Sequence, residues 1–119
     1  MKTFRTSTYS IPCAGLTGHR KVTFAVLADL HGLVFGQNHQ TLYKAIIDAN
    51  PDAILVAGDM VVHGSTETLE AAAGLFLRLC EIAPVFYVLG NHEYKMYLNP
   101  DTRNIYLNYE KLLTSAGIC

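Results

Sequence analysis

Apolar residues gather in three short runs along the chain, at residues 21–30, 52–58 and 85–90. The first run, KVTFAVLADL, is almost continuous, and turn-forming residues such as glycine, asparagine and proline bound all three runs. Runs of this kind predict strands that are buried on both faces, as in a parallel sheet. The earlier stretch FRTSTYSIP, residues 4–12, is rich in Thr, Ser and Tyr, and it predicts an edge strand that Pro12 ends.

Three helices are predicted where apolar residues recur with a helical period. The first covers residues 38–50 and ends there because a residue that precedes proline, here Pro51, avoids the α region. The second begins at residue 65 or 66, where Ser and Thr suit an N-cap, and the third covers residues 105–116, with Gly117 as its C-terminal cap. Their apolar faces consist of Leu42, Ala45, Ile46 and Ala49, of Leu69, Ala72, Ala73, Phe76 and Cys80, and of Tyr109, Leu112, Leu113 and Ala116.

Strands that alternate with helices predict right-handed β-α-β crossovers and therefore a mainly parallel sheet. We expect the α/β class, with a buried sheet, an N-terminal edge strand and a polar, aromatic loop at residues 91–104, NHEYKMYLNPDTRN. A chain of 119 residues suits one domain, and we expect a single domain over residues 1–119.

Composition and charge exclude several classes of protein. The formal net charge is −1 and only 16% of residues are charged, which indicates neither a basic surface for nucleic acid nor a disordered chain. Every apolar run is shorter than the roughly 20 residues of a membrane span, and the N-terminal MKTFRTSTYSIP lacks the apolar block of a signal peptide. We predict a cytoplasmic protein, and we leave open whether a membrane anchor lies outside this sequence. Three cysteines without a C-x-x-C pair argue against a disulfide framework.

Each of the three buried strands is followed directly by side chains that bind metals. Because the carboxyl ends of parallel strands meet at one edge of a sheet, we expect these side chains to lie side by side. Carboxylate oxygens combined with imidazole nitrogens suit divalent manganese, iron or zinc better than calcium. The residues are Asp29 and His31 after the first strand, Asp59 after the second, and Asn91, His92 and Glu93 after the third.

These residues form three motifs, D-x-H, G-D and G-N-H-E, that resemble the first three motifs of the calcineurin-like metallophosphoesterase family. The resemblance covers residues 22–93 and implies the N-terminal part of that family's α/β sandwich. It also implies two divalent metal ions: Asp29 and His31 would hold one ion, Asp59 would bridge both, and Asn91 would hold the second. His92 would be the catalytic residue that helps the leaving oxygen depart. The implied activity is hydrolysis of phosphomonoesters or phosphodiesters.

The resemblance has gaps. The second motif of the family often reads G-D-x-x-D, and Val62 stands at the last position here. The family supplies further metal-binding histidines in a G-H-x-H pair, whereas this sequence has no histidine after His92. Four of about seven ligands are therefore present, and we expect the domain to be incomplete and the chain to be a fragment that lacks the C-terminal histidine ligands. Whether this chain alone is active stays open at this stage. Glu93 would be an orienting residue behind the ligands.

Several alternatives stay open at this stage. Asp29 and Asp59 would also suit turns or helix caps after strands, and the remaining histidines, His19, His39 and His63, have ordinary loop or helix positions. A metal- or phosphate-binding interaction module without turnover is the main alternative to an enzyme. A nucleotide-binding α/β domain is a weaker one, because the glycine fingerprint is missing. The substrate would be a phosphoester, either small or macromolecular, and the sequence does not say which. It also leaves open which metal is bound and which oligomer forms.

Overall fold

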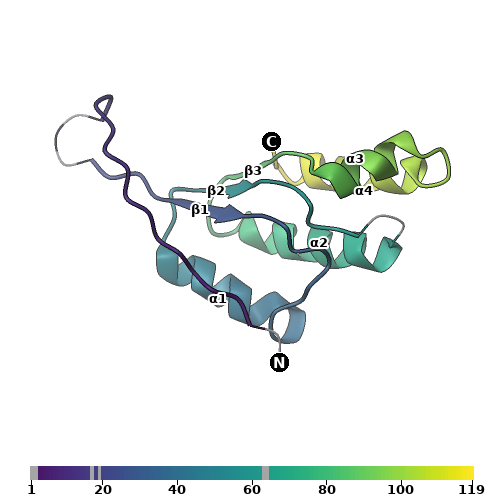
Figure 1. Ribbon diagram of the computed structural model, residues 1–119, viewed down its shortest axis with the longest axis horizontal. Coiled ribbons are helices and arrows are strands. Elements are labelled where there is room, and N and C mark those ends of the chain that lie inside the picture. Colours follow the sequence, from purple (N-terminus) through teal and green to yellow (C-terminus); the bar gives the residue numbers. More distant parts are fainter. Residues whose placement is uncertain (1–2, 17, 19, 63–64) are drawn as a thin grey trace.

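The computed structural model describes residues 3–16, 18, 20–62 and 65–119. Within these residues the chain has an α/β fold in which strands and helices alternate (Figure 1). The order is β1 (Phe24–Leu27), η1 (Gln37–His39), α1 (Gln40–Ala49), β2 (Ala53–Val56), α2 (Thr66–Leu79), β3 (Val85–Tyr87), α3 (Asn91–Leu98) and α4 (Arg103–Ser115). The predicted fold class is confirmed.

The three described strands form one parallel sheet in the order β1-β2-β3. Val26 lies opposite Leu55, which lies opposite Phe86, so these three residues form a row across the sheet. Each crossover contains one α-helix, as the alternating pattern predicts. All strands therefore point their carboxyl ends toward the same edge, and α3 begins beyond that edge (Figure 1).

One face of the sheet is buried and the other is exposed. Helices α1 and α2 lie on the same side of the strands (Figure 1). The buried side chains of Ile54 and Val56, and the side chains of the residues opposite them in the sheet, lie on this side. The opposite face carries Phe24 and Val26, which are 54% and 63% exposed, and Phe86, which is 44% exposed. The prediction that the first run is buried on both faces is therefore wrong. Its nearly continuous apolar character reflects an apolar face that the described residues leave open to solvent.

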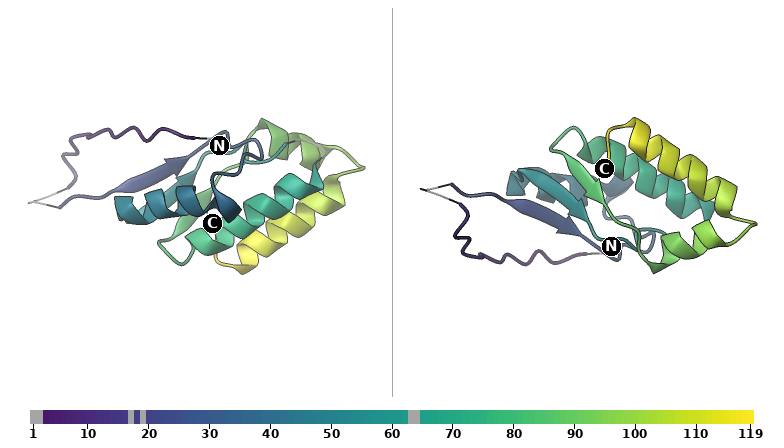
Figure 2. Two further views of the ribbon diagram at one scale, coloured as in Figure 1. Left: turned by 90° about the horizontal axis from the view of Figure 1, so that it is seen from below. Right: turned by 90° about the horizontal axis from the view of Figure 1, so that it is seen from above.

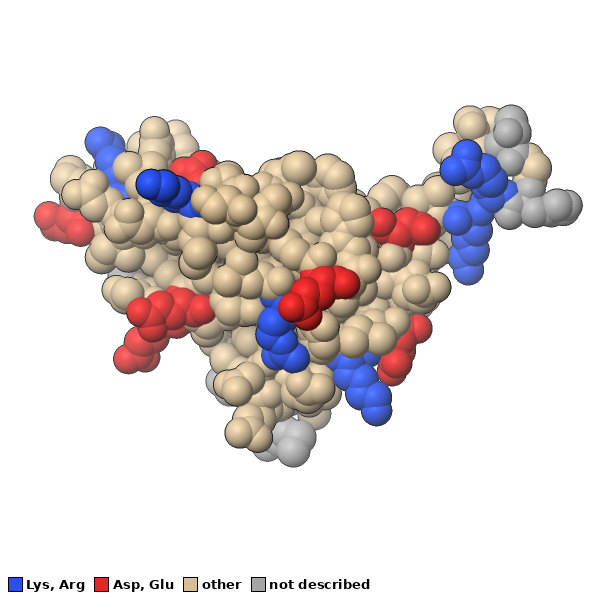
Figure 3. All heavy atoms as spheres, turned by 180° about the vertical axis from the view of Figure 1, so that it is seen from behind, with Lys and Arg blue, Asp and Glu red and all other residues tan. Residues whose placement is uncertain are grey.

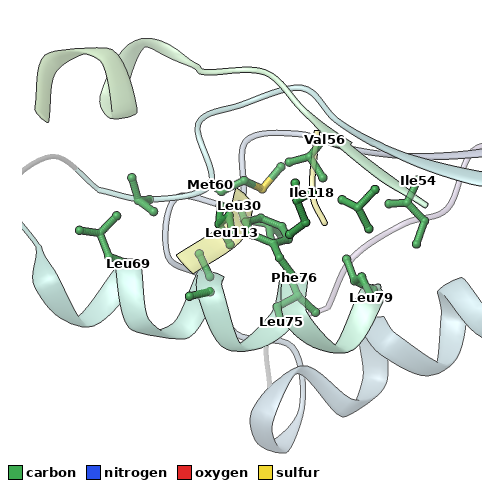
Figure 4. Packing of buried hydrophobic residues seen from close by; sticks show 14 of the residues in the cluster. Leu30, Ile54, Val56, Met60, Leu69, Leu75, Phe76, Leu79, Leu113 and Ile118 are labelled. Carbon is green, nitrogen blue, oxygen red and sulfur yellow. The ribbon is translucent and has the colours of Figure 1, made fainter. Parts of the chain in front are cut away.

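The core lies between the sheet and the helices. Figure 4 shows Phe76 and Leu79 of α2 directed toward Ile54 and Val56 of β2. Phe76 and Leu79 have no exposed surface. Helix α4 packs against both α2 and α3 and closes the core from the side. Loop residues at the carboxyl ends of the strands also contribute buried side chains, Leu30, Met60 and Val61.

Three predicted helix ends are confirmed: the start of α2, the end of α1 and the end of α4. The Ser65 side chain accepts a hydrogen bond from the backbone N–H of Thr68 at 3.3 Å and caps α2. Asn50 ends α1 in the left-handed conformation, with φ 47°. After α4, Gly117 has φ 90°, its N–H donates to the carbonyl of Thr114, and the Ile118 N–H donates to that of Leu113. These two bonds form a Schellman motif, which needs glycine because of the positive φ.

Residues 91–98 form helix α3 and residues 103–104 begin α4, so the predicted loop over residues 91–104 is wrong except at residues 99–102. The helix lacks an apolar face: Glu93 and Met96 are its buried residues. Its sequence therefore gives no period from which a helix could be predicted. Contacts with the loop after β2, described below, stabilise its first turn instead.

The predicted N-terminal edge strand is also wrong. The described residues 3–16 form no strand, although they run along the β1 side of the sheet (Figure 2). The ring of Phe4 packs edge-on against Phe35 at 5.2 Å between centroids, and most of the segment is exposed. Residues with strand propensity need a hydrogen-bonding partner, and this segment does not pair with β1.

The last residue of the sequence pairs with the free edge of β3. The Cys119 N–H donates to the carbonyl of Val85 at 3.2 Å, and the Tyr87 N–H donates to the carbonyl of Cys119 at 2.8 Å. This pattern is that of a parallel ladder with Cys119 opposite Phe86. Cys119 therefore adds a single parallel-paired residue to the sheet, on the side of β3 away from β2.

Charged side chains of both signs are interspersed over the face shown in Figure 3, between broad uncharged areas. In the part of the chain that the structure describes, every helix is too short or too polar to cross a membrane. The cytoplasmic location stays a prediction.

Candidate metal centre

Hydrogen bonding between β1 and β2 continues past the ends of the strands and brings the two loops together. The Asp29 N–H donates to the Gly58 carbonyl at 3.1 Å, and the His31 N–H donates to the Asp59 carbonyl at 3.0 Å. The Gly32 N–H donates to the Met60 carbonyl at 2.9 Å. The first and second motifs therefore lie side by side, as the sequence predicts.

Asp29, His31 and Asp59 form a cluster of possible metal ligands. One ligand atom from each lies within 4.8 Å of the others. Two ligands that bind one ion at about 2.1 Å are at most about 4.2 Å apart, so small side-chain rotations complete such a site. Nε2 of His31 lies 3.5 Å from Oδ1 of Asp29. Two carboxylates and one imidazole are a donor set that suits manganese, iron or zinc.

The backbone of all three cluster residues is left-handed. The φ angles are 56° at Asp29, 47° at His31 and 53° at Asp59. Residues other than glycine rarely adopt this conformation, and each instance costs about 1–3 kcal/mol unless the surrounding structure holds it. The hydrogen bonds between the two loops hold it here. Such strain is concentrated at functional sites, which supports the choice of these residues.

Two glycines allow the second and third strand ends to meet. Gly58 has φ 86°, and a Cβ atom there would clash with the backbone of Gly90. A Cβ atom at Gly90 would in turn clash with the backbone and carboxylate of Asp59. The close approach of Asp59 to the start of α3 therefore requires glycine at both positions.

The third motif forms the first turn of α3, with Gly90 as its N-cap. The backbone N–H of His92 donates to Oδ1 of Asp59 at 2.8 Å, so the Asp59 carboxylate caps the helix. Asp59 therefore does cap a helix, which is one of the alternatives that the sequence left open. The second oxygen of its carboxylate stays available to a metal. The His92 ring lies edge-on to His31, with centroids 5.0 Å apart. Asn91, directly before His92, is the first residue of the helix.

Glu93 lies behind the cluster and has no exposed surface. Its Oε2 accepts from the Asp59 N–H and its Oε1 from the Met60 N–H, both at 3.0 Å. The Tyr87 hydroxyl also donates to Oε1, at 2.5 Å. A buried carboxylate needs such donors to offset its lost hydration. Glu93 thus lies directly behind Asp59, and its role as an orienting residue stays a prediction.

Sequence reasoning missed the tyrosines that adjoin Glu93. Tyr87 lies in β3 and Tyr109 in α4, and the Tyr109 hydroxyl donates to the Tyr87 hydroxyl at 3.3 Å. Burial raises the pKa of Tyr87 far above its ordinary value, and the neighbouring Tyr109 and Glu93 raise it further. Burial also raises the pKa of Tyr109. Both hydroxyls therefore stay protonated and able to donate at neutral pH.

The other histidines lie apart from this cluster or outside the description. His39 is buried in the η1 turn, with φ 60°, and its Nδ1 has no hydrogen-bond partner among the described residues. Burial lowers the pKa of His39, and the nearby Arg78 lowers it further. With Arg78, His39 borders a hollow of 840 Å³ between η1 and α2, which none of the cluster residues line. His19 and His63 lie outside the described residues.

Comparison with known proteins agrees with this geometry. No curated protein matches the chain in sequence. The family model for calcineurin-like phosphoesterases matches residues 22–118, a range that contains β1, every candidate ligand and all four α-helices. The chain belongs to the calcineurin-like phosphoesterase family.

Proposed function

We propose that this protein is a metal-dependent phosphoesterase that hydrolyses phosphomonoesters or phosphodiesters. The observation that carries the proposal is the cluster of Asp29, His31 and Asp59 at the carboxyl ends of two adjacent parallel strands. This edge is where ligands bind in open α/β sheets. Membership of the calcineurin-like phosphoesterase family supports hydrolysis of a phosphoester as the reaction.

The centre would hold two divalent ions. Asp29 and His31 would bind the first ion, Asp59 would contact both, and Asn91 would bind the second. The position of Asn91 at the start of α3, one residue before the N–H that Asp59 accepts, supports its assignment. When bound, two divalent ions activate water and stabilise the attacking and leaving oxygens of a phosphoryl group.

His92 would act on the leaving group as a catalytic residue. The edge-on contact of its ring with His31 places it beside the cluster. An imidazole there is able to donate a hydrogen bond or a proton to the departing oxygen, because histidine exchanges protons near neutral pH. The main-chain bond from His92 to Asp59 fixes the position of this residue relative to the metal ligands.

The substrate would be a small or macromolecular phosphoester. The Asp29 side chain is 68% exposed and that of His31 is 42% exposed, so the described residues leave the centre open on one side. An open centre admits both kinds of substrate. Manganese is the first ion to test, because carboxylates and imidazole together suit it.

The test compares Asp59→Asn with the wild-type protein. The amide oxygen of Asn is still able to accept from the His92 N–H, so the first turn of α3 keeps its cap while the charge is lost. We expect Mn²⁺-dependent hydrolysis of a chromogenic phosphodiester to fall at least about 100-fold, with weaker Mn²⁺ binding in calorimetry. Asp48→Asn, an exposed change on α1, is the matched control and keeps wild-type activity. Measurable hydrolysis that is equal in wild-type protein and Asp59→Asn refutes the assignment.

A metal-binding module without turnover is the second candidate function. The exposure of Asp29 and His31 favours it, because many active sites close over the substrate and expel bulk water, whereas the described residues leave this centre open. The same experiment separates the two functions. Mn²⁺ binding that depends on Asp59, without hydrolysis of phosphomonoesters or phosphodiesters, supports the binding module.

A further inference from the structure

Glu93 connects the loop at Asp59 with two other elements. Its carboxylate accepts the backbone N–H groups of Asp59 and Met60 from the loop after β2, and the hydroxyl of Tyr87 from β3. Glu93 itself belongs to α3. Three segments that are separate in sequence thus meet at one buried carboxylate.

Tyr109 extends this connection to α4. Its hydroxyl donates to the Tyr87 hydroxyl, so that the Tyr87 oxygen accepts one bond and donates the next. The rings pack edge-on as well, with 6.4 Å between the centroids of Tyr87 and Tyr109. The order of donors is Tyr109, then Tyr87, then Glu93. We name these three residues the Tyr–Tyr–Glu chain.

The Asp59 loop needs such support because its conformation is strained. Asp59 has φ 53° and follows Gly58, which has φ 86°. Two N–H groups in succession, those of Asp59 and Met60, point at the Glu93 carboxylate, and this fixes the plane of the peptide between them. The orientation of that peptide determines where the Asp59 side chain points. A change in the position of Glu93 therefore moves a candidate metal ligand.

We infer that Tyr87 and Tyr109 are positioning residues, which act through Glu93 to hold Asp59 in the geometry that binds metal. The geometry of the Asp59 loop follows from the hydrogen bonds of the Tyr–Tyr–Glu chain. The expected effect on metal affinity rests on the proposed function. Neither tyrosine touches the metal ligands through its hydroxyl. Removal of an outer partner of a metal site commonly weakens metal binding about 10-fold to 100-fold.

Tyr87→Phe and Tyr109→Phe test this inference, because each removes one hydroxyl and leaves the ring in place. Tyr106→Phe is the matched control: Tyr106 is buried on α4 and packs against Tyr109, but it is not a donor to Glu93 in the described structure. The first readout is amide hydrogen exchange in metal-free protein, followed by NMR. Protection at Asp59 and Met60 is compared with that at Ile54 and Ala57, whose N–H groups bond within the sheet.

We expect Tyr87→Phe to lower protection at Asp59 and Met60 about 10-fold relative to Ile54 and Ala57, and Tyr109→Phe to lower it less, about 3-fold. Mn²⁺ affinity, measured by calorimetry, falls about 10-fold and about 3-fold in the same order. Tyr106→Phe changes neither quantity. Tyr87→Phe lowers protection evenly at all four amides if its hydroxyl has only a structural role, and that result overturns the inference. A local loss of protection in a protein that does not bind Mn²⁺ refutes the proposed function and supports the positioning of the loop.

Discussion

Asp59 and Glu93 hold each other's segments in place. The Asp59 N–H donates to Oε2 of Glu93, while Oδ1 of Asp59 accepts from the N–H of His92, the residue before Glu93. The arrangement resembles a capping box, with the difference that its two halves come from different parts of the chain. It explains how a single aspartate caps a helix and also belongs to the cluster of candidate metal ligands. The loop after β2 and helix α3 therefore depend on each other to fold.

Glu93→Gln should destabilise the protein. The amide that replaces the carboxylate has one acceptor oxygen, so at least one of the three donors at Glu93 loses its partner in a buried site. A buried donor without a partner costs about 1–3 kcal/mol, and we expect the free energy of unfolding in urea to fall by this amount. Glu70→Gln, an exposed change on α2, should leave it within about 0.5 kcal/mol. Equal stabilities of the two variants would show that the buried carboxylate is not needed for the fold.

Gly58→Ala should destabilise the protein more than an ordinary glycine replacement. Gly58 has φ 86°, and an added Cβ atom meets the backbone of Gly90, which is unable to move without displacing α3. We expect a loss of about 1–3 kcal/mol, measured by urea unfolding. Gly74→Ala is the control, because Gly74 lies inside α2 and a Cβ there has open space. That change should stabilise the helix by about 0.5–1 kcal/mol. Similar effects of both replacements would contradict the close approach of Gly58 to Gly90.

The strands could be predicted because they are short apolar runs, and three of the four α-helices could be predicted because their apolar residues form periodic faces. The face of α2 that contains Leu69 and Phe76 is an example. Helix α3 could not be predicted, since its capping residue, Asp59, comes from another segment and only the folded chain brings the two together. The exposed face of β1 could not be predicted either. An apolar run does not say whether both of its faces find a partner.

The candidate site, too, could be predicted from the sequence only in part. The approach of Asp29 to Asp59 could be predicted, because parallel strands bring consecutive carboxyl ends together. The partners of Glu93 could not, because Tyr87 and Tyr109 carry no motif and look like ordinary core aromatics in the sequence. The roles of Asn91 and His92 as ligand and catalytic residue stay predictions.

The exposed sheet face should tolerate polar substitution, unlike the buried face. Val26 is 63% exposed, whereas Val56, on the neighbouring strand, is 1% exposed. Val26→Thr should change the free energy of unfolding by less than about 0.5 kcal/mol and reduce the fluorescence of an apolar dye bound to the native protein. Val56→Thr buries a hydroxyl and should cost about 1–3 kcal/mol. If Val26→Thr is as destabilising as Val56→Thr, another part of the protein covers this face in solution.

Stability should decrease at alkaline pH because of three tyrosines, of which Tyr106 and Tyr109 are buried and Tyr87 is partly buried. Burial raises the pKa values of Tyr87, Tyr106 and Tyr109 above the ordinary value of tyrosine. Above pH about 10 each tyrosine loses its proton in the unfolded chain and keeps it in the native protein. The unfolded state then binds fewer protons, so the free energy of unfolding falls with rising pH, by up to about 1.4 kcal/mol per pH unit for each tyrosine.

This pH dependence can be measured in two ways. Urea unfolding should give a constant free energy between pH about 7 and 9 and a steep decrease above pH about 10. In the native protein, the ultraviolet absorbance of tyrosinate should show that Tyr87, Tyr106 and Tyr109 keep their protons until the protein unfolds. Tyr87→Phe should make the alkaline decrease shallower, since one of the three groups is then missing. Ionisation of all seven tyrosines at pH about 10 in folded protein would contradict the burial of the Tyr–Tyr–Glu chain.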